Sequence, residues 1–328
     1  MASNAAFGET ENVAITVLVD NSANLMARSR RGVRRFTRAP LLAEHGFAAL
    51  VDLRSQGVRV LWDAGMTPGA LIENMRRMRI PPGSIDILAV SHGHDDHTAA
   101  VTEVLKAMDL RAAARTWPAG SSMQEMRRWV EGRRVPLVIH PAAFRERWEV
   151  HENGSREGPV QPFSRAEWEA AGAQVVESEG PHRLAAGCWT TGFVPRLSFE
   201  QAGRSPRSTY RQGDAFLPDD LEEDQAIVIH VKGKGLVVLA GCAHAGIVNT
   251  VNYARQISAV ERVWAVLGGF HLATAGREEI ERSVEAIRAM QPKLVAPSHC
   301  TGFEAQCCFA TRMPQAFVEG VVGTTYRF

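Results

Sequence analysis

The sequence has no hydrophobic run long enough to span a membrane, which takes about 20 apolar residues in succession. Residues 1–12 are polar and lack the apolar stretch of a signal peptide. The net charge of +1 gives no general attraction to nucleic acid. We therefore expect a cytoplasmic protein with no membrane contact and no nucleic-acid partner. Its 328 residues, 45% of them hydrophobic, are enough to bury a large core.

Cysteine is also scarce. The five cysteines are an odd number with no C-x-x-C pair: Cys188, Cys242, Cys300, Cys307 and Cys308. This pattern argues against both a disulfide framework and a separate zinc knuckle. The chain also lacks a G-x-x-x-x-G-K-S/T loop and a G-x-G-x-x-G turn after a strand. Because those motifs cradle nucleotide phosphates, we expect no nucleotide cofactor.

Short apolar runs rich in β-formers alternate with helical patterns in both halves of the chain. We expect strands at 13–19, 47–53, 58–62, 85–90, 225–231, 236–240, 262–267 and 294–296. We expect helices at 71–78, 98–105, 248–257 and 278–290. Strands followed by helices in both halves predict an α/β (α+β) fold, in which two sheets pack face to face with helices outside.

Two stretches, 109–180 and 201–223, are rich in Arg, Glu, Gly and Pro. We expect them to form elaborations over the core of a single domain that spans 1–328. The acidic run at 219–224 is most simply a solvated loop before a strand.

A cluster of potential metal ligands, S-H-G-H-D-D-H at 91–97, directly follows the apolar run at 85–90. Because side chains two apart in an extended segment point the same way, His92 and His94 can bind one ion from one side. Asp96 and His97 precede the helical pattern at 98–105, which turns them toward a neighbouring position. One loop can therefore serve two metal ions.

Imidazole and carboxylate ligands together suit zinc, and manganese or iron is possible in such a mixed site. The alternative is a polar loop between a strand and a helix, whose histidines are solvated or cap the helix. Four potential ligands within six residues favour the metal site.

The cluster at 92–97, together with L-W-D-A-G at 61–65, resembles the metallo-β-lactamase superfamily. The resemblance implies the four-layer αββα sandwich of that superfamily and a metal-dependent hydrolase. Further motifs are similar to one branch, which carries the label 7,8-dihydropterin-6-methyl-4-(β-D-ribofuranosyl)aminobenzene-5′-phosphate synthase. They lie at 19–21, 44–46, 190–196, 241–249, 268–272 and 298–302. The resemblance covers residues 13–303, and many members of the branch are described only as metallo-hydrolases.

The superfamily usually takes a histidine, a bridging aspartate after a strand, and a final histidine from the C-terminal half of the chain. The resemblance places the final histidine at His299, which would share the second ion with Asp96 and His97. The segment 190–192, which usually carries the other histidine, has no imidazole. His244 is the natural replacement, because it leaves a strand end toward the same edge.

Cys242 follows the strand at 236–240, where the superfamily usually has a Gly-Asp pair. A thiolate or a water therefore stands in for the bridging carboxylate, unless Cys242 is a plain buried thiol. The missing aspartate could also leave a single tightly held ion.

Four other side chains are assigned to the site. The resemblance suggests that Asp63 accepts a hydrogen bond from a ligating histidine or from the ligand loop. His271 follows two glycines that let the backbone approach a ligand, and it is a candidate general acid or substrate contact. Asn21, at the end of the first strand, is a candidate substrate contact or a turn former. Arg196 is a candidate contact for an anion.

The predicted chemistry is hydrolysis of a small, anionic ester, lactone, amide or phosphoester. Zinc lowers the pKa of a bound water to about 7 and so supplies hydroxide at neutral pH. Asp96 would bind metal and hold the proton of the attacking water. The six arginines of 28–38 could clamp a phosphate or carboxylate, or form a solvated loop or a subunit contact in a homo-oligomer.

Two other classes of function stay open. One is a dihydropterin-type synthase, a transferase whose metal ions activate a pyrophosphate leaving group during C–N bond formation. The other is a protein that binds metal without turnover, which the missing bridging aspartate makes conceivable.

Overall fold

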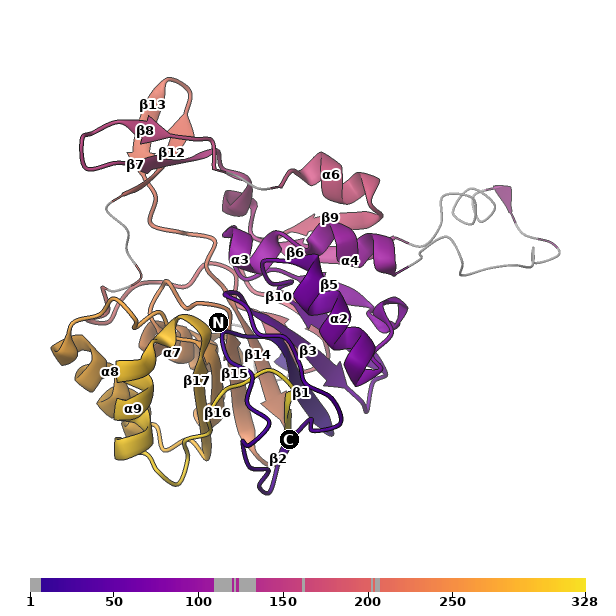
Figure 1. Cartoon of the computed structure of the whole chain (residues 1–328), viewed down its shortest axis with the longest axis vertical. Coiled ribbons are helices and arrows are strands. Elements are labelled where there is room, and N and C mark those ends of the chain that lie inside the picture. The colour runs from indigo at the N-terminus through magenta and orange to yellow at the C-terminus, as the bar shows by residue number, and fades with distance from the viewer. Residues whose placement is uncertain are drawn as a thin grey trace.

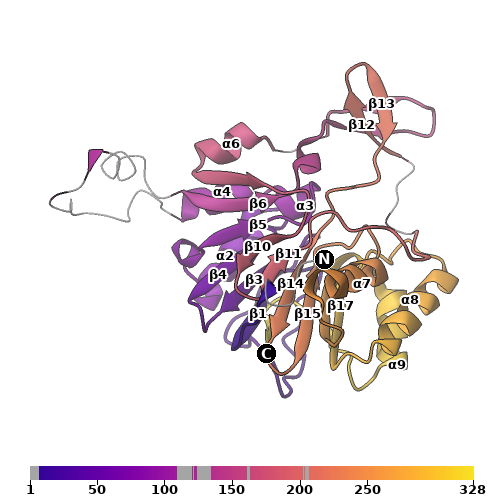
Figure 2. The same cartoon turned by 180° about the vertical axis from the view of Figure 1, so that it is seen from behind.

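Two large β-sheets face each other in the computed structural model, with helices on both outer faces (Figures 1 and 2). The structure describes residues 7–108, 120, 122–123, 134–160, 163–201, 203 and 207–328. No helix in these ranges is long and apolar enough to cross a bilayer.

The first sheet has eight strands in the order β2-β18-β1-β3-β4-β5-β6-β9. Their bounds are β1 (Val13–Val19), β2 (Val33–Arg35), β3 (Ala48–Leu53), β4 (Val58–Trp62), β5 (Ile87–Ala89), β6 (Val135–Ile139), β9 (Ala173–Glu177) and β18 (Thr324–Arg327). Pairing is antiparallel from β2 to β4 and parallel from β4 to β9. The parallel strands β4 and β5 therefore end at the same edge.

The second sheet has six strands in the order β10-β11-β14-β15-β16-β17. Their bounds are β10 (His182–Ala185), β11 (Cys188–Thr190), β14 (Ala226–Val231), β15 (Gly235–Ala240), β16 (Val263–Gly269) and β17 (Leu294–Ser298). The strands β15, β16 and β17 run parallel, so their carboxyl ends also share one edge.

The helices divide between the two outer faces. Helices α2 (Pro68–Met78), α3 (Asp95–Thr98), α4 (Val101–Ala107) and α6 (Arg165–Ala170) belong to the N-terminal half, and α7 (Ile247–Ser258), α8 (Arg277–Ala289) and α9 (Phe303–Arg312) to the C-terminal half. The pattern predicted as one helix at 98–105 is divided, because the chain turns between α3 and α4 at residues 99–100.

Side-chain alternation along the strands creates three apolar layers. On β15, Val237 and Leu239 face the first sheet, whereas Leu236 and Val238 face α7 and α8. A matching cluster of α2, α4 and α6 side chains covers the other face of the first sheet. Helices, two sheets and helices thus make the four-layer αββα sandwich that the sequence predicts.

A third, four-stranded sheet projects from the sandwich in both views (Figures 1 and 2). It consists of β7 (Arg147–Val150), β8 (Arg156–Glu157), β12 (Ser208–Gln212) and β13 (Ala215–Pro218). Each of the stretches expected to form elaborations supplies two of its strands.

The structure corrects one part of that expectation. The stretch 109–180 also supplies β6 and β9, which are strands of the eight-stranded sheet, because their apolar residues pack under α4 and α6. Parts of both stretches (109–119, 121, 124–133, 161–162, 202 and 204–206) lie outside the described residues. A single domain over 1–328 stays a prediction.

The arginine-rich segment 28–38 contains β2 and lies against the C-terminal end of the chain. Arg30 donates to the carbonyl oxygen of Ala316 at 3.0 Å, and Arg35 donates to that of Glu319 at 2.8 Å. These two arginines therefore fix the end of the chain, which differs from the anion clamp considered for this segment.

Candidate metal centre

The carboxyl ends of five strands meet at one edge of the sandwich and carry the predicted site residues. Asp63 follows β4, and the loop 91–97 follows β5. On the other sheet, Cys242, His271 and His299 follow β15, β16 and β17. Parallel strands place their carboxyl ends side by side, which is where open α/β sheets bind ligands.

His92, His94 and His244 form the first group of potential ligands. Nε2 of His92 lies 3.0 Å from Nδ1 of His94 and 3.2 Å from Nε2 of His244. The ring centroids of His94 and His244 are 4.9 Å apart. The structure thus brings together the two imidazoles of the loop and the imidazole proposed to replace the missing one.

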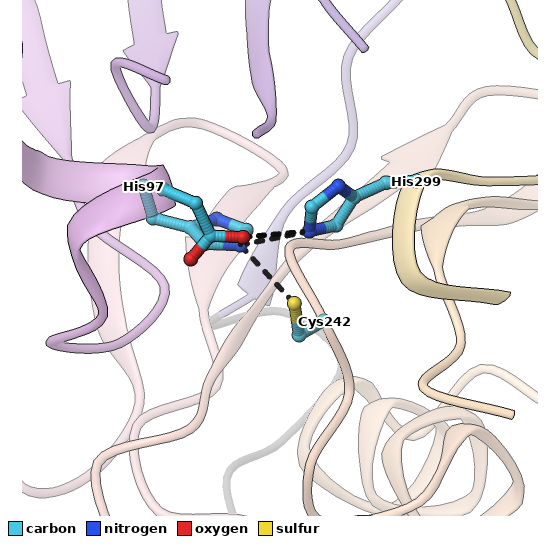
Figure 3. Close-up of side chains that lie close together, drawn as sticks. His97, Cys242 and His299 are labelled. Atoms are coloured by element: carbon cyan, nitrogen blue, oxygen red, sulfur yellow. Dashed lines mark hydrogen bonds and ion pairs between the residues drawn. The ribbon is translucent and has the colours of Figure 1, made fainter. Parts of the chain in front are cut away.

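Asp96, His97 and His299 form the second group, and Figure 3 labels its two histidines together with Cys242. Nε2 of His97 lies 3.2 Å from Nε2 of His299, and the two rings are turned toward each other. Oδ2 of Asp96 lies 3.2 Å from Nε2 of His299 and 3.5 Å from Nε2 of His97. Asp96 and His97 follow a strand of the first sheet, and His299 follows a strand of the second.

Cys242 belongs to both groups. Its Sγ lies 3.1 Å from Nε2 of His97, and it is within 4.8 Å of the ligand atoms of His92 and His244 as well. A side chain between two metal positions is what the superfamily's bridging aspartate usually provides. Sγ of Cys242 lies in the corresponding place, between the two groups of potential ligands.

In the second group, hydrogen bonds at Nδ1 orient two histidine rings so that their Nε2 atoms face each other. Nδ1 of His97 donates to Oδ2 of Asp63 at 2.7 Å, and Nδ1 of His299 donates to Oδ1 of Asn21 at 2.9 Å. A neutral imidazole that donates from Nδ1 has only a lone pair at Nε2. Two neutral rings would therefore repel at this separation of 3.2 Å, so positive charge, either a proton or a metal ion, has to lie between the two Nε2 atoms.

The first group has the same arrangement. Oγ of Ser91 donates to Asp63, so Nδ1 of His92 donates to Oγ of Ser91 at 2.8 Å. Nδ1 of His244 lies 3.4 Å from the carbonyl oxygen of Gly203. Both Nε2 atoms then present lone pairs at a separation of 3.2 Å.

The pKa shifts agree with cation binding. Burial, reinforced by neighbouring histidines, lowers the pKa of His92 and of His244 well below the usual range, so both rings are neutral. Burial likewise lowers the pKa of His94 to about 4. Burial alone would lower the pKa of His97, but Asp96 and Asp63 outweigh it and raise this pKa to about 9. The surroundings of His97 thus favour a positive charge at Nε2, which either a proton or a metal ion would supply.

Four site residues with a Cβ atom have left-handed backbone: Asp63 (φ 58°), Ala243 (φ 55°), His271 (φ 44°) and His299 (φ 48°). This conformation costs about 1–2 kcal/mol for each such residue. Backbone strain of this kind is concentrated at functional sites, where the surrounding structure enforces it. The strain therefore supports a functional role for this edge of the sandwich.

The substrate contacts predicted at Asn21 and Arg196 have protein partners in the structure. Oδ1 of Asn21 accepts from His299, and its Nδ2 lies 3.3 Å from Nδ1 of His45. The guanidinium of Arg196 donates to the carbonyl oxygens of His244 and Asp220. Asn21 therefore orients His299 and Arg196 holds the His244 loop, and a contact of either side chain with a substrate stays a prediction.

The acidic run at 219–224 is not a solvated loop, and this expectation was wrong. Asp219, Glu223 and Asp224 are 2%, 0% and 1% exposed. Oδ2 of Asp224 accepts from the amide of Ala245, and Asp219 and Glu223 pair with the buried Arg147. Asp220 and Glu222 are exposed, whereas the other three acidic side chains are buried because they bind Arg147 and the backbone of the loop that carries His244.

His271 lies beside the first group, with its ring centroid 4.0 Å from that of His244. Its Nδ1 is buried and has no hydrogen-bond partner among the described residues. The ligand atoms of His271, Cys242 and Cys300 also lie within 4.8 Å of one another. Sequence reasoning missed Cys300, although its place directly after His299 was a signal.

The donor set fits a zinc-type cation. Imidazole nitrogens, a carboxylate oxygen and a thiol are the ligands that zinc takes in proteins, whereas Mg²⁺ and Ca²⁺ prefer oxygen alone. In His92, His97 and His299 the Nδ1 atom is hydrogen-bonded to another side chain, which is the usual orientation device for metal-binding histidines. The αββα fold carries this candidate metal-binding donor set at one edge of its two sheets.

The chain belongs to the metallo-β-lactamase superfamily, whose family model matches residues 43–299. A curated relative from Methanocaldococcus jannaschii, 7,8-dihydropterin-6-methyl-4-(beta-D-ribofuranosyl)-aminobenzene-5'-phosphate synthase, is 26% identical over 326 residues, which are 98% of each chain. The solved structure of Tm1679, a metal-dependent hydrolase of the β-lactamase superfamily, has a TM-score of 0.70 at 21% identity and covers 96% of this chain and 99% of its own. The metallo-β-lactamase fold protein YhfI from Bacillus subtilis has a TM-score of 0.50 at 11% identity, covering 97% and 100%. The two solved structures support the fold.

Proposed function

We propose that this chain is a metal-dependent hydrolase that acts on a small anionic ester, lactone or phosphoester. The observation that carries the proposal is the pair of facing Nε2 atoms in each group, His92 with His244 and His97 with His299, both 3.2 Å apart, together with the neutral state of His92 and His244 that burial and their low pKa enforce. Such an arrangement is stable only around positive charge.

Zinc is the cation that the donor set fits best, with Mn²⁺ or iron as alternatives. His92, His94 and His244 would hold one ion, and Asp96, His97 and His299 the other, with Cys242 shared between them. When bound, such ions acidify a water molecule and polarise a substrate oxygen.

Two side chains are placed to move protons. Oδ2 of Asp96 lies at the second group and 3.4 Å from Nε2 of His45, so it can hold the proton of a water molecule. His271 has a buried nitrogen without a partner beside His244, and it can donate a proton to a leaving group. We therefore assign Asp96 and His271 as the catalytic proton carriers.

The charge of the ligand set favours an anionic substrate. Two divalent ions held by one carboxylate, one thiolate and neutral imidazoles leave the immediate site net positive. An anion would gain from this charge in a site that is largely closed to water. We also propose the cytoplasm as the compartment, because the cysteines are free and a reducing environment keeps the Cys242 thiol intact.

The test begins with the metal content of the purified protein and a substrate panel. The panel contains bis-p-nitrophenyl phosphate, a homoserine lactone, and a dihydropterin pyrophosphate with an arylamine. His92→Ala should abolish hydrolysis, while His151→Ala, a change at an exposed histidine, should leave it intact. The proposal fails if the protein carries less than about one metal per chain and His92→Ala leaves every activity unchanged.

A second candidate function is a dihydropterin-type synthase. Its support is the curated synthase that is 26% identical to this chain over nearly its whole length. In that reaction the pyrophosphate leaves as the arylamine nitrogen forms a bond to carbon, so the same cations would stabilise the leaving group. The synthase would be favoured if the dihydropterin pyrophosphate and the arylamine give a product with a new C–N bond while bis-p-nitrophenyl phosphate and the homoserine lactone are not hydrolysed. Metal binding without any turnover would favour the non-catalytic alternative.

A further inference from the structure

A buried arginine lies directly behind the loop that carries His92 and His94. Arg147 is 4% exposed, and it pairs with Asp219 at 2.6 Å and with Glu223 at 2.5 Å. Its two Nη atoms also donate to the carbonyl oxygens of Ala142 and Ala143. Such a planar fork can join several acceptors at fixed angles, which a lysine cannot do.

Glu223 connects this arginine to the ligand loop. Its Oε1 accepts from Nη2 of Arg147 and also from the amide of Gly93, at 3.3 Å. Gly93 is the residue between His92 and His94. A single carboxylate oxygen therefore links the guanidinium to the backbone that sets the separation of two predicted ligands.

Close packing reinforces the link. A Cβ atom at Gly93 would lie 2.8 Å from Nη1 of Arg147 and 3.0 Å from the carbonyl oxygen of Ala143. The guanidinium thus lies against the glycine and limits movement of the loop toward it. Next to Glu223, the amide of Gln225 donates to the carbonyl oxygen of Ser91 at 3.0 Å.

The same arginine closes the base of the projecting four-stranded sheet. Arg147 is the first residue of β7, and Asp219 directly follows β13. Their ion pair joins the place where the chain first enters this sheet, at β7, to the place where it finally leaves it, after β13. The base of the projecting sheet and the ligand loop therefore share one buried cation.

We infer that Arg147 is a positioning residue for the metal centre, which through Glu223 holds the His92-Gly93-His94 backbone in its ligand geometry. The inference rests on the proposed function, because it assumes that His92 and His94 bind a metal ion. Residues that orient ligands in this indirect way typically change metal affinity about 10- to 100-fold when they are replaced.

The test compares Arg147→Lys with Arg145→Lys. Arg145 lies two residues earlier, pairs with the half-exposed Glu222 and stacks on Tyr210, so it is a matched control outside the site. Zinc affinity is measured by competition with a chromogenic chelator, and unfolding of the zinc-free protein is followed in urea. We expect Arg147→Lys to weaken the binding of one of the two zinc ions about 10- to 100-fold. Arg145→Lys should leave the affinity for both ions unchanged.

Several results would overturn the inference. Arg147→Lys could bind both zinc ions as the wild type does, or it could weaken both constants equally in step with lower stability, as a purely structural role requires. If Arg147→Lys does not fold, Glu223→Gln is measured in its place. This variant keeps an oxygen that can accept from Gly93 but removes the negative charge that pairs with Arg147. Unchanged zinc affinity in Glu223→Gln would also refute the inference. Failure of the wild type itself to bind zinc would instead refute the proposed function.

Discussion

Asp63 and His97 form a hydrogen bond at the centre of the site, with Nδ1 of His97 donating to Oδ2 of Asp63 at 2.7 Å. Both side chains are fully buried. The same carboxylate accepts from the amide of Ser91 at 2.7 Å and from its Oγ at 2.8 Å. One residue thus sets the tautomer of His97 in the second group and fixes the start of the loop that carries His92 and His94 of the first group.

Asp63→Asn should weaken zinc binding about 10- to 100-fold, because an amide can accept at only one of the two carboxylate positions. The lost acceptor leaves either the Ser91 backbone or the His97 ring without its partner. Chelator competition measures the change. Asp52→Asn, a change at a partly buried carboxylate that pairs with Arg54, is the control and should bind zinc normally. Equal zinc constants for the two variants would contradict the role given to Asp63.

Cys242→Asp restores the carboxylate that the superfamily usually has at this position. Oxygen ligands suit Mn²⁺ and thiolates suit zinc, so the affinity ratio of Mn²⁺ to Zn²⁺ should rise by about tenfold or more. In the cobalt-substituted protein the sulfur-to-metal charge-transfer band should disappear. Cys307→Ser, at an exposed cysteine, should keep the band. A band that persists in Cys242→Asp would show that another sulfur binds the metal.

Gly192→Ala should destabilise the fold by two effects. Gly192 has φ of 62°, and a Cβ atom there would lie 2.4 Å from the carbonyl oxygens of Glu179 and Gly180. Gly213 has φ of 61° with nothing within 4 Å, so Gly213→Ala carries the backbone strain alone. We expect a loss of about 1–2 kcal/mol in the free energy of unfolding for Gly213→Ala. Gly192→Ala should lose about 1–3 kcal/mol more through overpacking. Urea unfolding measures both, and equal losses would rule out the clash.

Cys188 should resist alkylation at pH 8. Burial raises the pKa of its thiol to about 12, and only the thiolate reacts. Because the pKa is raised, the thiolate fraction grows about tenfold for each pH unit up to that value. Mass spectrometry after iodoacetamide treatment should show Cys307 modified and Cys188 intact. Modification of Cys188 at pH 8 in the folded protein would mean that the strand β11 opens.

Local patterns in the sequence were sufficient for most of the sandwich. The strand predicted at 58–62 has the same bounds as β4, and the helix predicted at 278–290 overlaps α8 to within one residue at each end. Such elements are encoded by alternation or by helical period among neighbouring residues. The short strands β2 and β18 were not predicted, because three or four residues carry too little pattern and their pairing depends on the far end of the chain.

The sequence by itself determined the ligand loop at 91–97, because His92, His94, Asp96 and His97 are close in the chain and the turn from strand to helix is a local property. Only the tertiary structure decided which residues complete the site. Cys242 meets His97 across 145 positions, and His299 meets it across 202. Contacts at such separations depend on how two sheets pack, and no local pattern specifies that packing.

The acidic run at 219–224 is a second feature that the tertiary structure, and not the local sequence, decides. Asp219 and Glu223 are in a sequence that is typical of a solvated loop, yet both are buried against Arg147. Charge alone predicts exposure, because an unpaired buried carboxylate is strongly disfavoured. A partner supplied by β7, more than 70 positions away, reverses that prediction. Hydrophobic composition and periodicity thus determined the layers of the sandwich and the loop at 91–97. The packing of the two sheets, which brings distant strand ends together, decided which side chains meet at that edge.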